Sequence, residues 1–389
     1  MTTAVQTKQH LFNNYGQRAL TMVSGQGAYL YDETGKEYLD FTAGIAVCNL
    51  GHAHPGVAQV IAEQASTLIH TSNLYAIPGQ FALAEKLASL SGLADDVKVL
   101  FVNSGTEANE AALKLARRYQ MQQGHGEEKS RVLSLPKAFH GRTMGSLSLT
   151  PKAAYHEGFT PLVPNCETPP DLDSVFAAVD ETVAACIVEV IQGEAGVLGI
   201  DPAFLRALES RLHAVGALLI VDEVQTGVGR TGTFFAYEEV GIKPDIVTMA
   251  KGLGNGMPVG AVLAKKAVAD AFTPGSHGTT FGGNPLAMAV ANYVVDTVAK
   301  EQFLAHVREI GDAIEAVLHT YVKNVSGRGL MWGFDVPDAA NFVARAAALG
   351  LLVTSCGACR IRIVPPLIID QTHVDQFANA LGVLTSVSS

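Results

Sequence analysis

The sequence predicts an α/β protein built around a mostly parallel sheet. Through the middle of the chain, short apolar segments rich in β-branched residues alternate with segments of helical periodicity. The apolar segments cover residues 97–102, 131–135, 186–191, 218–221 and 245–250. Strands that are apolar on both faces are typical of a parallel sheet covered by helices. We therefore expect such a sheet in the centre of the molecule.

Two of the covering helices carry clear signals. One is expected to begin after Asp201, a suitable N-cap that is followed by Pro202 at the first helical position. It has apolar residues every three or four positions and ends near Gly216, a suitable C-cap. The second helix is expected over about 106–119 and follows the first apolar segment directly.

The two ends of the chain differ from its centre. Residues 27–41, GAYLYDETGKEYLDF, predict a β-hairpin, and residues 361–369, IRIVPPLII, predict a strand near the C-terminus. We predict a large cofactor-binding domain over residues 50–285 and a smaller α+β domain formed by residues 1–49 and 286–389.

Composition argues against several classes of protein. The chain of 389 residues has a net charge of −10 and no basic cluster, which argues against nucleic-acid binding. Its longest apolar run, residues 214–221, is far shorter than the roughly 18 residues that a membrane helix needs. The N-terminus lacks the apolar segment of a secretory signal, so we expect a cytoplasmic protein.

The five cysteines are scattered, which favours reduced thiols over a disulfide framework. Cys356 and Cys359 form a single C-x-x-C without the second pair of ligands that a zinc site needs. His52, His54 and His140 are not grouped like ligands either, so no metal site is expected.

Polar residues follow the apolar segments, at the sheet edge where ligands bind in parallel α/β folds. Ser104, Gly105 and Thr106 lie between a strand and a helix, where free backbone N–H groups and the helix dipole suit a phosphate. The alternative is that Ser104 or Thr106 only caps the helix.

Two charged residues also follow predicted strands. Asp222 ends the segment 218–221 and should be partly buried, so it needs a cationic partner such as a protonated pyridine nitrogen, or else an Arg or Lys. Lys251 follows the segment 245–250, where desolvation would lower its pKa, as a Schiff-base lysine requires. The alternative for Lys251 is a solvated, inert side chain.

Gly227, Gly229 and Gly232 form a literal G-x-G-x-x-G, the fingerprint of dinucleotide binding. That fingerprint needs a strand running straight into the glycine turn and a helix starting there. Residues 222–226 intervene here, and Lys243-Pro244 leaves little room for a helix. An NAD-dependent dehydrogenase is therefore kept as an alternative and is not the main interpretation. A second alternative is a protein that binds a cofactor without catalysing a reaction.

Seven ordered motifs that span most of the chain resemble those of the class III (ω-) aminotransferases. They are NSGTEANEAALKLAR, FHGRTMGSLS, EVIQGEAGV, VDEVQTGVGRTG, DIVTMAKGLGNGMPVGA, HGTTFGGNPLA and RIVPPLI. One departure is Val190, where the family often has proline. The resemblance implies pyridoxal 5′-phosphate as cofactor, on the type I fold of pyridoxal-phosphate aminotransferases with a large domain and a smaller α+β domain.

The resemblance also implies individual roles. Lys251 would bind the cofactor covalently and carry a proton during catalysis, and Asp222 would keep the pyridine nitrogen protonated. Gln225 would hydrogen-bond the phenolic oxygen of the cofactor, and Phe139 would stack on its ring. The phosphate would be held by residues 104–106, namely Ser104, Gly105 and Thr106, joined by Thr280 of the neighbouring subunit. A homodimer with its active site at the subunit interface is therefore expected.

Within the family, segments such as GIAVCNLGH and HTSNLY are similar to those of the acetylornithine aminotransferases of arginine biosynthesis. This implies N2-acetylornithine as donor and 2-oxoglutarate as acceptor. Donors that stay possible are succinylornithine, succinyl-diaminopimelate, ornithine and 4-aminobutyrate.

One pocket must then accept a donor with a single distal carboxylate and also glutamate, which carries a second carboxylate on its reacting carbon. Arg142, assisted by Thr279, is the candidate for the distal carboxylate. Arg362 is the candidate for the second carboxylate, with Glu194 as a movable counter-charge that covers it in the first half-reaction. Alternatively, Arg362 points outward and Glu194 is a turn acid, or Arg360 on the same strand face takes the role.

Overall fold

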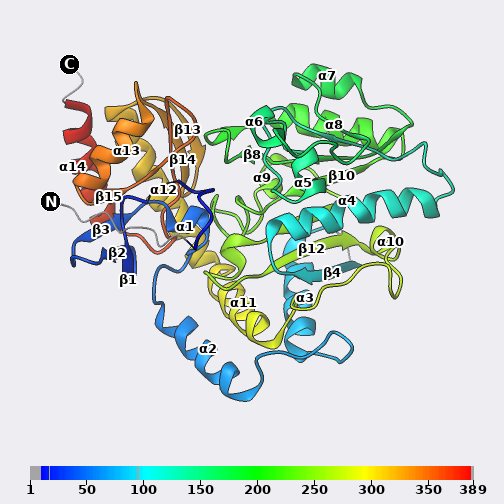
Figure 1. Cartoon of the computed structure of the whole chain (residues 1–389), viewed down its shortest axis with the longest axis horizontal. Coiled ribbons are helices and arrows are strands. Elements are labelled where there is room, and N and C mark those ends of the chain that lie inside the picture. Colours follow the sequence, from blue (N-terminus) through cyan, green and yellow to red (C-terminus); the bar gives the residue numbers. More distant parts are fainter. Residues whose placement is uncertain (1–9, 17, 94–95, 387–389) are drawn as a thin grey trace.

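The computed structural model describes residues 10–16, 18–93 and 96–386. Within these residues, a seven-stranded sheet forms the centre of the larger part of the molecule (Figure 1). Its order is β4 (Val97–Val102), β12 (Gly260–Lys265), β11 (Ile246–Met249), β10 (Leu218–Asp222), β7 (Val183–Val188), β5 (Arg131–Ser134) and β6 (Cys166–Glu167). Only β12 runs antiparallel to its neighbours among these strands. The expectation of a mostly parallel sheet is confirmed.

Helices cover both faces of this sheet, and β10 shows why. All five of its residues are buried, and they alternate between two apolar clusters. Leu218 and Ile220 belong to the cluster with α4 (Gly105–Gln122), whereas Leu219 and Val221 belong to the cluster with α8 (Pro202–Ala214). A strand apolar on both faces therefore lies between two helical layers.

The predicted helices are present, with small shifts at their ends. Asp201 caps α8 by accepting the N–H of Ala203, and Gly216 follows the helix with a φ of 67°. α4 begins at Gly105 and is longer than the expected 106–119. The other helices of the larger part are α2 (Pro55–Thr67), α3 (Pro78–Ser91), α5 (Met144–Ser148), α6 (Ala153–His156), α7 (Leu172–Ala177), α9 (Tyr237–Val240) and α10 (Lys266–Ala269).

One strand differs from its predicted position. The segment 186–191 was expected to be a strand, but β7 spans Val183–Val188. Ala184 and Ala185 have low strand propensity, yet both are completely buried in the apolar cluster that contains α4, where small side chains let the helix approach. Tertiary packing therefore decides where this strand begins and ends. In addition, β12 was not predicted from the sequence.

The two ends of the chain meet in a second region, on the left of Figure 1. The predicted hairpin is present as β2 (Tyr29–Asp32) and β3 (Glu37–Asp40), with β1 (Met22–Gln26) beside it. β15 (Leu351–Leu352) pairs in parallel with β3 and so joins the C-terminal part to the N-terminal part. The predicted division at residues 49/50 and 285/286 stays a prediction.

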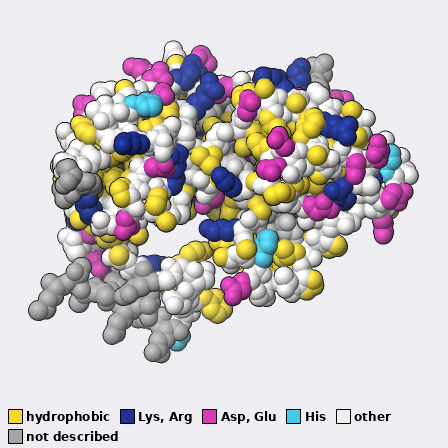
Figure 2. Space-filling view, turned by 90° about the horizontal axis from the view of Figure 1, so that it is seen from above, with side chains coloured by type: hydrophobic (Ala, Val, Ile, Leu, Met, Phe, Trp, Pro, Cys, Tyr) yellow, Lys and Arg dark blue, Asp and Glu magenta, His cyan; other side chains and the backbone are white. Residues whose placement is uncertain are grey.

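The remaining elements complete this region and its connection to the sheet. They are α1 (Ala43–Ala46), β8 (Ile191–Gln192), β9 (Leu198–Gly199), η1 (Lys251–Leu253), α11 (Pro285–Val298), α12 (Glu301–Tyr321), β13 (Lys323–Arg328), β14 (Met331–Asp335), α13 (Ala339–Ala348), β16 (Thr354–Ser355), β17 (Arg360–Ile363) and α14 (Gln371–Ser386). None of the described helices is long and apolar enough to cross a membrane. Basic and acidic side chains are interspersed over the face shown in Figure 2.

The glycine-rich turn after β10 is a packing element. Gly229 and Gly232 have φ values of 81° and 97°, which favour glycine. A Cβ at Gly229 would lie 2.6 Å from Val298, and one at Gly232 would lie 2.6 Å from the side chain of Arg308. The following helix, α9, has only four residues. This turn therefore lacks the open glycine loop and long helix that bind a pyrophosphate, which agrees with the interpretation drawn from the sequence.

A buried arginine joins the two regions next to this turn. The Arg230 side chain is completely buried and donates to the backbone oxygens of Leu330 and Pro365 and to Oδ1 of Asn49. Burial lowers the pKa of Arg230 to about 9. Because these partners come from both ends of the chain, Arg230 holds them against the sheet and fixes the segment that follows β17.

His52 supplies a pH-dependent contribution to stability. Its Nε2 lies 2.8 Å from Oδ2 of the fully buried Asp40, and this hydrogen bond is the main reason that the pKa of His52 rises from 6.5 to about 9. Because the folded pKa is raised, the stabilisation is fully present below pH 6.5 and is lost as the pH rises through about 9.

We expect the melting temperatures of the wild type and His52→Gln to differ at pH 6 and to converge by pH 10. The control is His125→Gln, at an exposed histidine whose ring forms no hydrogen bond or ion pair among the described residues. This control should leave the pH profile of the wild type unchanged.

Candidate active site

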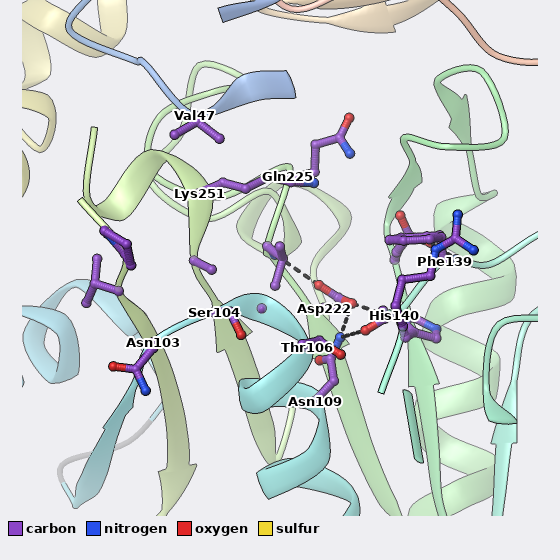
Figure 3. Close-up of a pocket in the computed structure, with 18 of the residues that line it drawn as sticks. Val47, Asn103, Ser104, Thr106, Asn109, Phe139, His140, Asp222, Gln225 and Lys251 are labelled. Carbon is purple, nitrogen blue, oxygen red and sulfur yellow. Dashed lines mark hydrogen bonds and ion pairs between the residues drawn. The ribbon is translucent and has the colours of Figure 1, made fainter. Parts of the chain in front are cut away.

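A cavity of about 600 Å³ lies at the carboxyl ends of β4, β10 and β11. The structure brings together there most of the residues that the sequence singled out (Figure 3). They are Ser104, Gly105, Thr106, Phe139, Arg142, Asp222, Gln225 and Lys251. Tyr15, from the N-terminal segment, reaches the same cavity.

Asp222 lies at the floor of this cavity as the last residue of β10. Its Oδ2 accepts hydrogen bonds from Nδ2 of Asn109 and Nδ1 of His140, each at 2.8 Å, and its Oδ1 accepts the N–H of Val224 at 3.0 Å. Within the described part of the chain, no Arg or Lys forms an ion pair with it. The alternative of a structural Arg or Lys pair is therefore wrong for the described residues.

Asn109 and His140 are site residues that the sequence alone did not reveal. Asn109 lies on the first turns of α4, and its Oδ1 accepts a hydrogen bond from Thr248 at 2.7 Å. His140 follows Phe139 in the loop after β5 and is completely buried at its side chain. Asn109 follows β4 and His140 follows β5, and neither strand is a neighbour of β10, so only the folded sheet shows that both reach Asp222.

The N-terminus of α4 faces the cavity. Oγ of Ser104 accepts the N–H of Glu107 at 3.3 Å, so this side chain does cap the helix. The next residue must be glycine, because a Cβ at Gly105 would lie 2.6 Å from Val224. The first N–H groups of an α-helix have no intrahelical acceptor. At the start of an 18-residue helix they form a site for an anion, which Thr106 extends with a hydroxyl group 2.8 Å from that of Thr143.

Lys251 enters the cavity from strained backbone. Its φ of 42° lies in the left-handed region, and Gly252 after it packs so closely that a Cβ would lie 2.3 Å from Asn49. Such strain in a non-glycine residue is typical of functional sites. Burial lowers the pKa of Lys251, although Glu194 and Asp222 partly oppose this effect. Among the described residues its amine has no hydrogen-bond partner. Burial therefore shifts this amine toward its reactive, deprotonated form relative to a lysine in water.

Arg362 and Glu194 form the pair that the sequence suggested. NH1 of Arg362 lies 2.6 Å from Oε1 of Glu194 and also donates to Oε1 of Gln225 at 3.2 Å. Burial alone would raise the pKa of Glu194, but Arg362 outweighs it and the pKa is lowered. Arg362 is 2% exposed, so it does not point into solvent. Arg360 is engaged elsewhere, by the backbone oxygen of Gly196 and by Asp335.

Phe139 lies on the side of the cavity opposite Lys251 (Figure 3), and Arg142 also lines the cavity. The guanidinium of Arg142 lies 3.5 Å from the ring centre of Tyr155 and 5.7 Å from that of Phe139. The backbone N–H of Phe139 donates to Oε1 of Glu189, whose pKa burial raises to about 7.

Thr279 and Thr280 do not line the cavity of a single chain. The hydroxyl of Thr279 accepts hydrogen bonds from Asn103 at 3.2 Å and from the N–H of Gly282 at 3.1 Å. Thr280 is exposed. Their predicted roles stay predictions, and that of Thr280 requires a second subunit.

No group of three or more His, Cys, Asp or Glu side chains suited to a metal ion occurs in the described ranges. Cys356 is partly buried and lies against the backbone oxygen of Gly193, whereas Cys359 is exposed.

Comparisons with known proteins agree with this geometry. A family model described as "Aminotransferase class-III" matches residues 12–383. The chain is 47% identical over 376 residues to an acetylornithine aminotransferase of Aquifex aeolicus, covering 96% of this chain and 98% of the relative. Among solved structures, an ornithine aminotransferase of Toxoplasma gondii, described with partial occupancy of pyridoxal phosphate (PLP), superposes with a TM-score of 0.92 at 30% identity, covering 98% and 93% of the two chains. An N-acetylornithine aminotransferase of Stenotrophomonas maltophilia gives a TM-score of 0.82 at 33% identity, covering 97% and 98%.

The close approach at Gly105 gives a test of the anion site. We expect Gly105→Ala to weaken binding of pyridoxal 5′-phosphate by about tenfold or more, because the new methyl group displaces Val224 and the helix start. Titration of the apoprotein followed by absorbance measures this affinity. The control is Gly199→Ala, where a Cβ meets nothing within 4 Å. Equal affinities of the two variants would contradict the assignment.

Proposed function

The chain belongs to the class-III aminotransferases, and from that premise we propose that it transfers the terminal amino group of N2-acetyl-L-ornithine to 2-oxoglutarate. Its fold is the type I fold of pyridoxal-phosphate aminotransferases, and its cofactor is pyridoxal 5′-phosphate. The observation that carries the proposal is the ion pair of Arg362 with Glu194, whose charges act on Lys251 although neither residue lines the cavity itself. An enzyme with these two substrates needs one removable and one permanent carboxylate site.

The cavity fits the cofactor on three separate grounds. The start of α4 at Gly105 suits a phosphate, and a Cβ at this residue would clash with Val224 and displace the helix start. The Asp222 carboxylate suits a protonated pyridine nitrogen, because its other partners leave it without an Arg or Lys among the described residues. Lys251 supplies the unpaired amine that would hold an aldehyde covalently. Phe139 and Gln225 would hold the ring face and the phenolic oxygen.

The bound cofactor supplies an aldehyde that accepts the amino group and an electron-poor ring that stabilises negative charge on the substrate. The residues of the chain hold the cofactor in place and move the protons. Asp222 holds the proton on the ring nitrogen, and Asn109 and His140 fix the direction of its carboxylate. Lys251, with its lowered pKa, would take the proton from the substrate carbon that bears the amino group and deliver it, in the same half-reaction, to the cofactor carbon that carried the aldehyde.

The two arginines would divide the substrates between them. Arg142 would bind the carboxylate distant from the reacting amine, which both N2-acetylornithine and glutamate carry. Arg362 would bind the second carboxylate of glutamate or 2-oxoglutarate once Glu194 moves away. While the acylated donor is bound, Glu194 neutralises Arg362, which would otherwise be a buried unpaired charge.

We further propose a homodimer whose interface completes the phosphate site with Thr280. The support is a set of large apolar side chains near this residue that a single chain leaves exposed. They are Leu74 at 88%, Tyr75 at 69%, Phe81 at 65% and Phe281 at 63% exposure. Exposed apolar surface of this kind marks interaction sites. We place the enzyme in the cytoplasm and in arginine biosynthesis.

The donor is tested by comparing kcat/KM over a panel of amines with 2-oxoglutarate as acceptor. We expect N2-acetylornithine to exceed ornithine and 4-aminobutyrate by at least about tenfold, since an apolar subsite contact is worth ~1.4 kcal/mol or more. Succinylornithine and succinyl-diaminopimelate belong in the same panel. A clear preference for any of these four would replace the proposed donor while leaving the aminotransferase assignment intact.

The role of Glu194 is tested by Glu194→Gln in the two half-reactions measured separately. Loss of the negative charge leaves Arg362 unpaired and open, which favours glutamate and disfavours the monocarboxylate donor. We expect the ratio of kcat/KM for N2-acetylornithine to that for glutamate to fall by about tenfold. Glu157→Gln, at an exposed acid outside the cavity, provides the matched control. An unchanged ratio in Glu194→Gln would show that the acid does not gate Arg362.

A further inference from the structure

Arg142 is held in a way that differs from every other arginine near the cavity. Within the described ranges its guanidinium makes no hydrogen bond and no ion pair, and it lies against the aromatic rings of Tyr155 and Phe139. Arg362 is covered by Glu194, and Arg360 is tied to Asp335 and to backbone oxygens. All the N–H groups of Arg142 are therefore free of protein acceptors in the described structure.

Tyr155 is the residue that orients this free guanidinium. The guanidinium carbon lies 3.5 Å from the centre of the Tyr155 ring, against 5.7 Å for Phe139. A cation over an aromatic face is attracted by the ring quadrupole without any of its N–H donors being used. Stacking thus fixes the plane of the guanidinium and leaves its edge for a carboxylate.

Tyr155 is itself fixed from several directions. It lies on α6, whose His156 contacts the backbone oxygens of Leu147 at 3.1 Å and Thr150 at 2.8 Å through Nε2. The Tyr155 hydroxyl accepts a hydrogen bond from Nζ of Lys152 at 3.1 Å, and its ring stands edge-on to Phe139 with ring centres 6.4 Å apart. The ring is therefore a fixed support rather than a mobile surface residue.

We propose that Tyr155 is a positioning residue that holds Arg142 open for the distal carboxylate of both substrates. The inference rests on the proposed function, because it assumes that Arg142 binds that carboxylate. It explains why the two substrate arginines are built differently. Arg362 serves one half-reaction and needs a counter-charge that can leave, whereas Arg142 serves both and needs a support that never competes with the substrate.

The test compares Tyr155→Leu, which removes the ring, with Tyr155→Phe, which keeps the ring and loses only the hydroxyl. We expect Tyr155→Leu to raise the KM of both N2-acetylornithine and 2-oxoglutarate by about 3- to 20-fold with a smaller change in kcat. Tyr155→Phe should stay within about twofold of the wild type. The control is Phe176→Leu, which removes a partly exposed aromatic ring on α7, a helix that carries neither Tyr155 nor Arg142.

A double-mutant cycle with Arg142→Met separates positioning from a general structural effect. If Tyr155 acts through Arg142, then Tyr155→Leu adds nothing to the KM of the Arg142→Met variant. Single-turnover rates with pentan-1-amine, a donor without a carboxylate, should be equal in the wild type and Tyr155→Leu. Additive effects on KM, an equal loss with pentan-1-amine, or a Tyr155→Phe variant as impaired as Tyr155→Leu would each overturn the proposal.

Measurements on the wild-type protein distinguish a failure of the donor proposal from a failure of the proposal about Tyr155. If wild-type protein prefers another ω-amino donor that carries a distal carboxylate, the donor proposal fails, and the same variants are compared with that donor. The cycle with 2-oxoglutarate tests Tyr155 in either case.

Discussion

The buried carboxylate of Asp222 is the constraint around which the cavity is arranged. It ends a strand that is apolar on both faces, so the sheet places a carboxylate that is only 4% exposed at the floor of the cavity. Asn109 and His140 fix its direction but do not provide a permanent positive charge. A buried carboxylate in this state is stabilised by a cationic ligand. Under the proposed function, the ring nitrogen of the cofactor would fill this need, and Lys251 would hold the cofactor from across the cavity.

The two arginines assigned to the substrates are held in different ways. Arg362 is 2% exposed and is paired with Glu194, which a substrate carboxylate would replace. Arg142 is exposed and is stacked on Tyr155, which leaves its N–H groups available. Under the proposed function, neither a monocarboxylate donor nor a dicarboxylate acceptor leaves a buried charge unpaired.

Much of this arrangement could be predicted from the sequence, because it depends on local signals. The strand at 218–221, the cap of Asp201 and the glycine-led helix start are read from neighbouring residues. Strand β7 (Val183–Val188) was misplaced by three residues, since its alanines become a strand only through packing against α4. The partners Asn109 and His140 could not be assigned, because their meeting at one carboxylate depends on the order of strands in the sheet. The proposed phosphate contact of Thr280 would require a second chain.

The central claim is that the amine of Lys251 is within covalent reach of a pyridoxal 5′-phosphate whose ring nitrogen faces Asp222. Borohydride reduction of the cofactor-loaded protein fixes the cofactor to whichever lysine holds it, and peptide mass spectrometry then locates that lysine. The account predicts the modification on the peptide that contains Lys251, and its loss when an excess of amino donor is added before reduction. A modification on a different lysine, or none on a protein that has bound the cofactor, would contradict it.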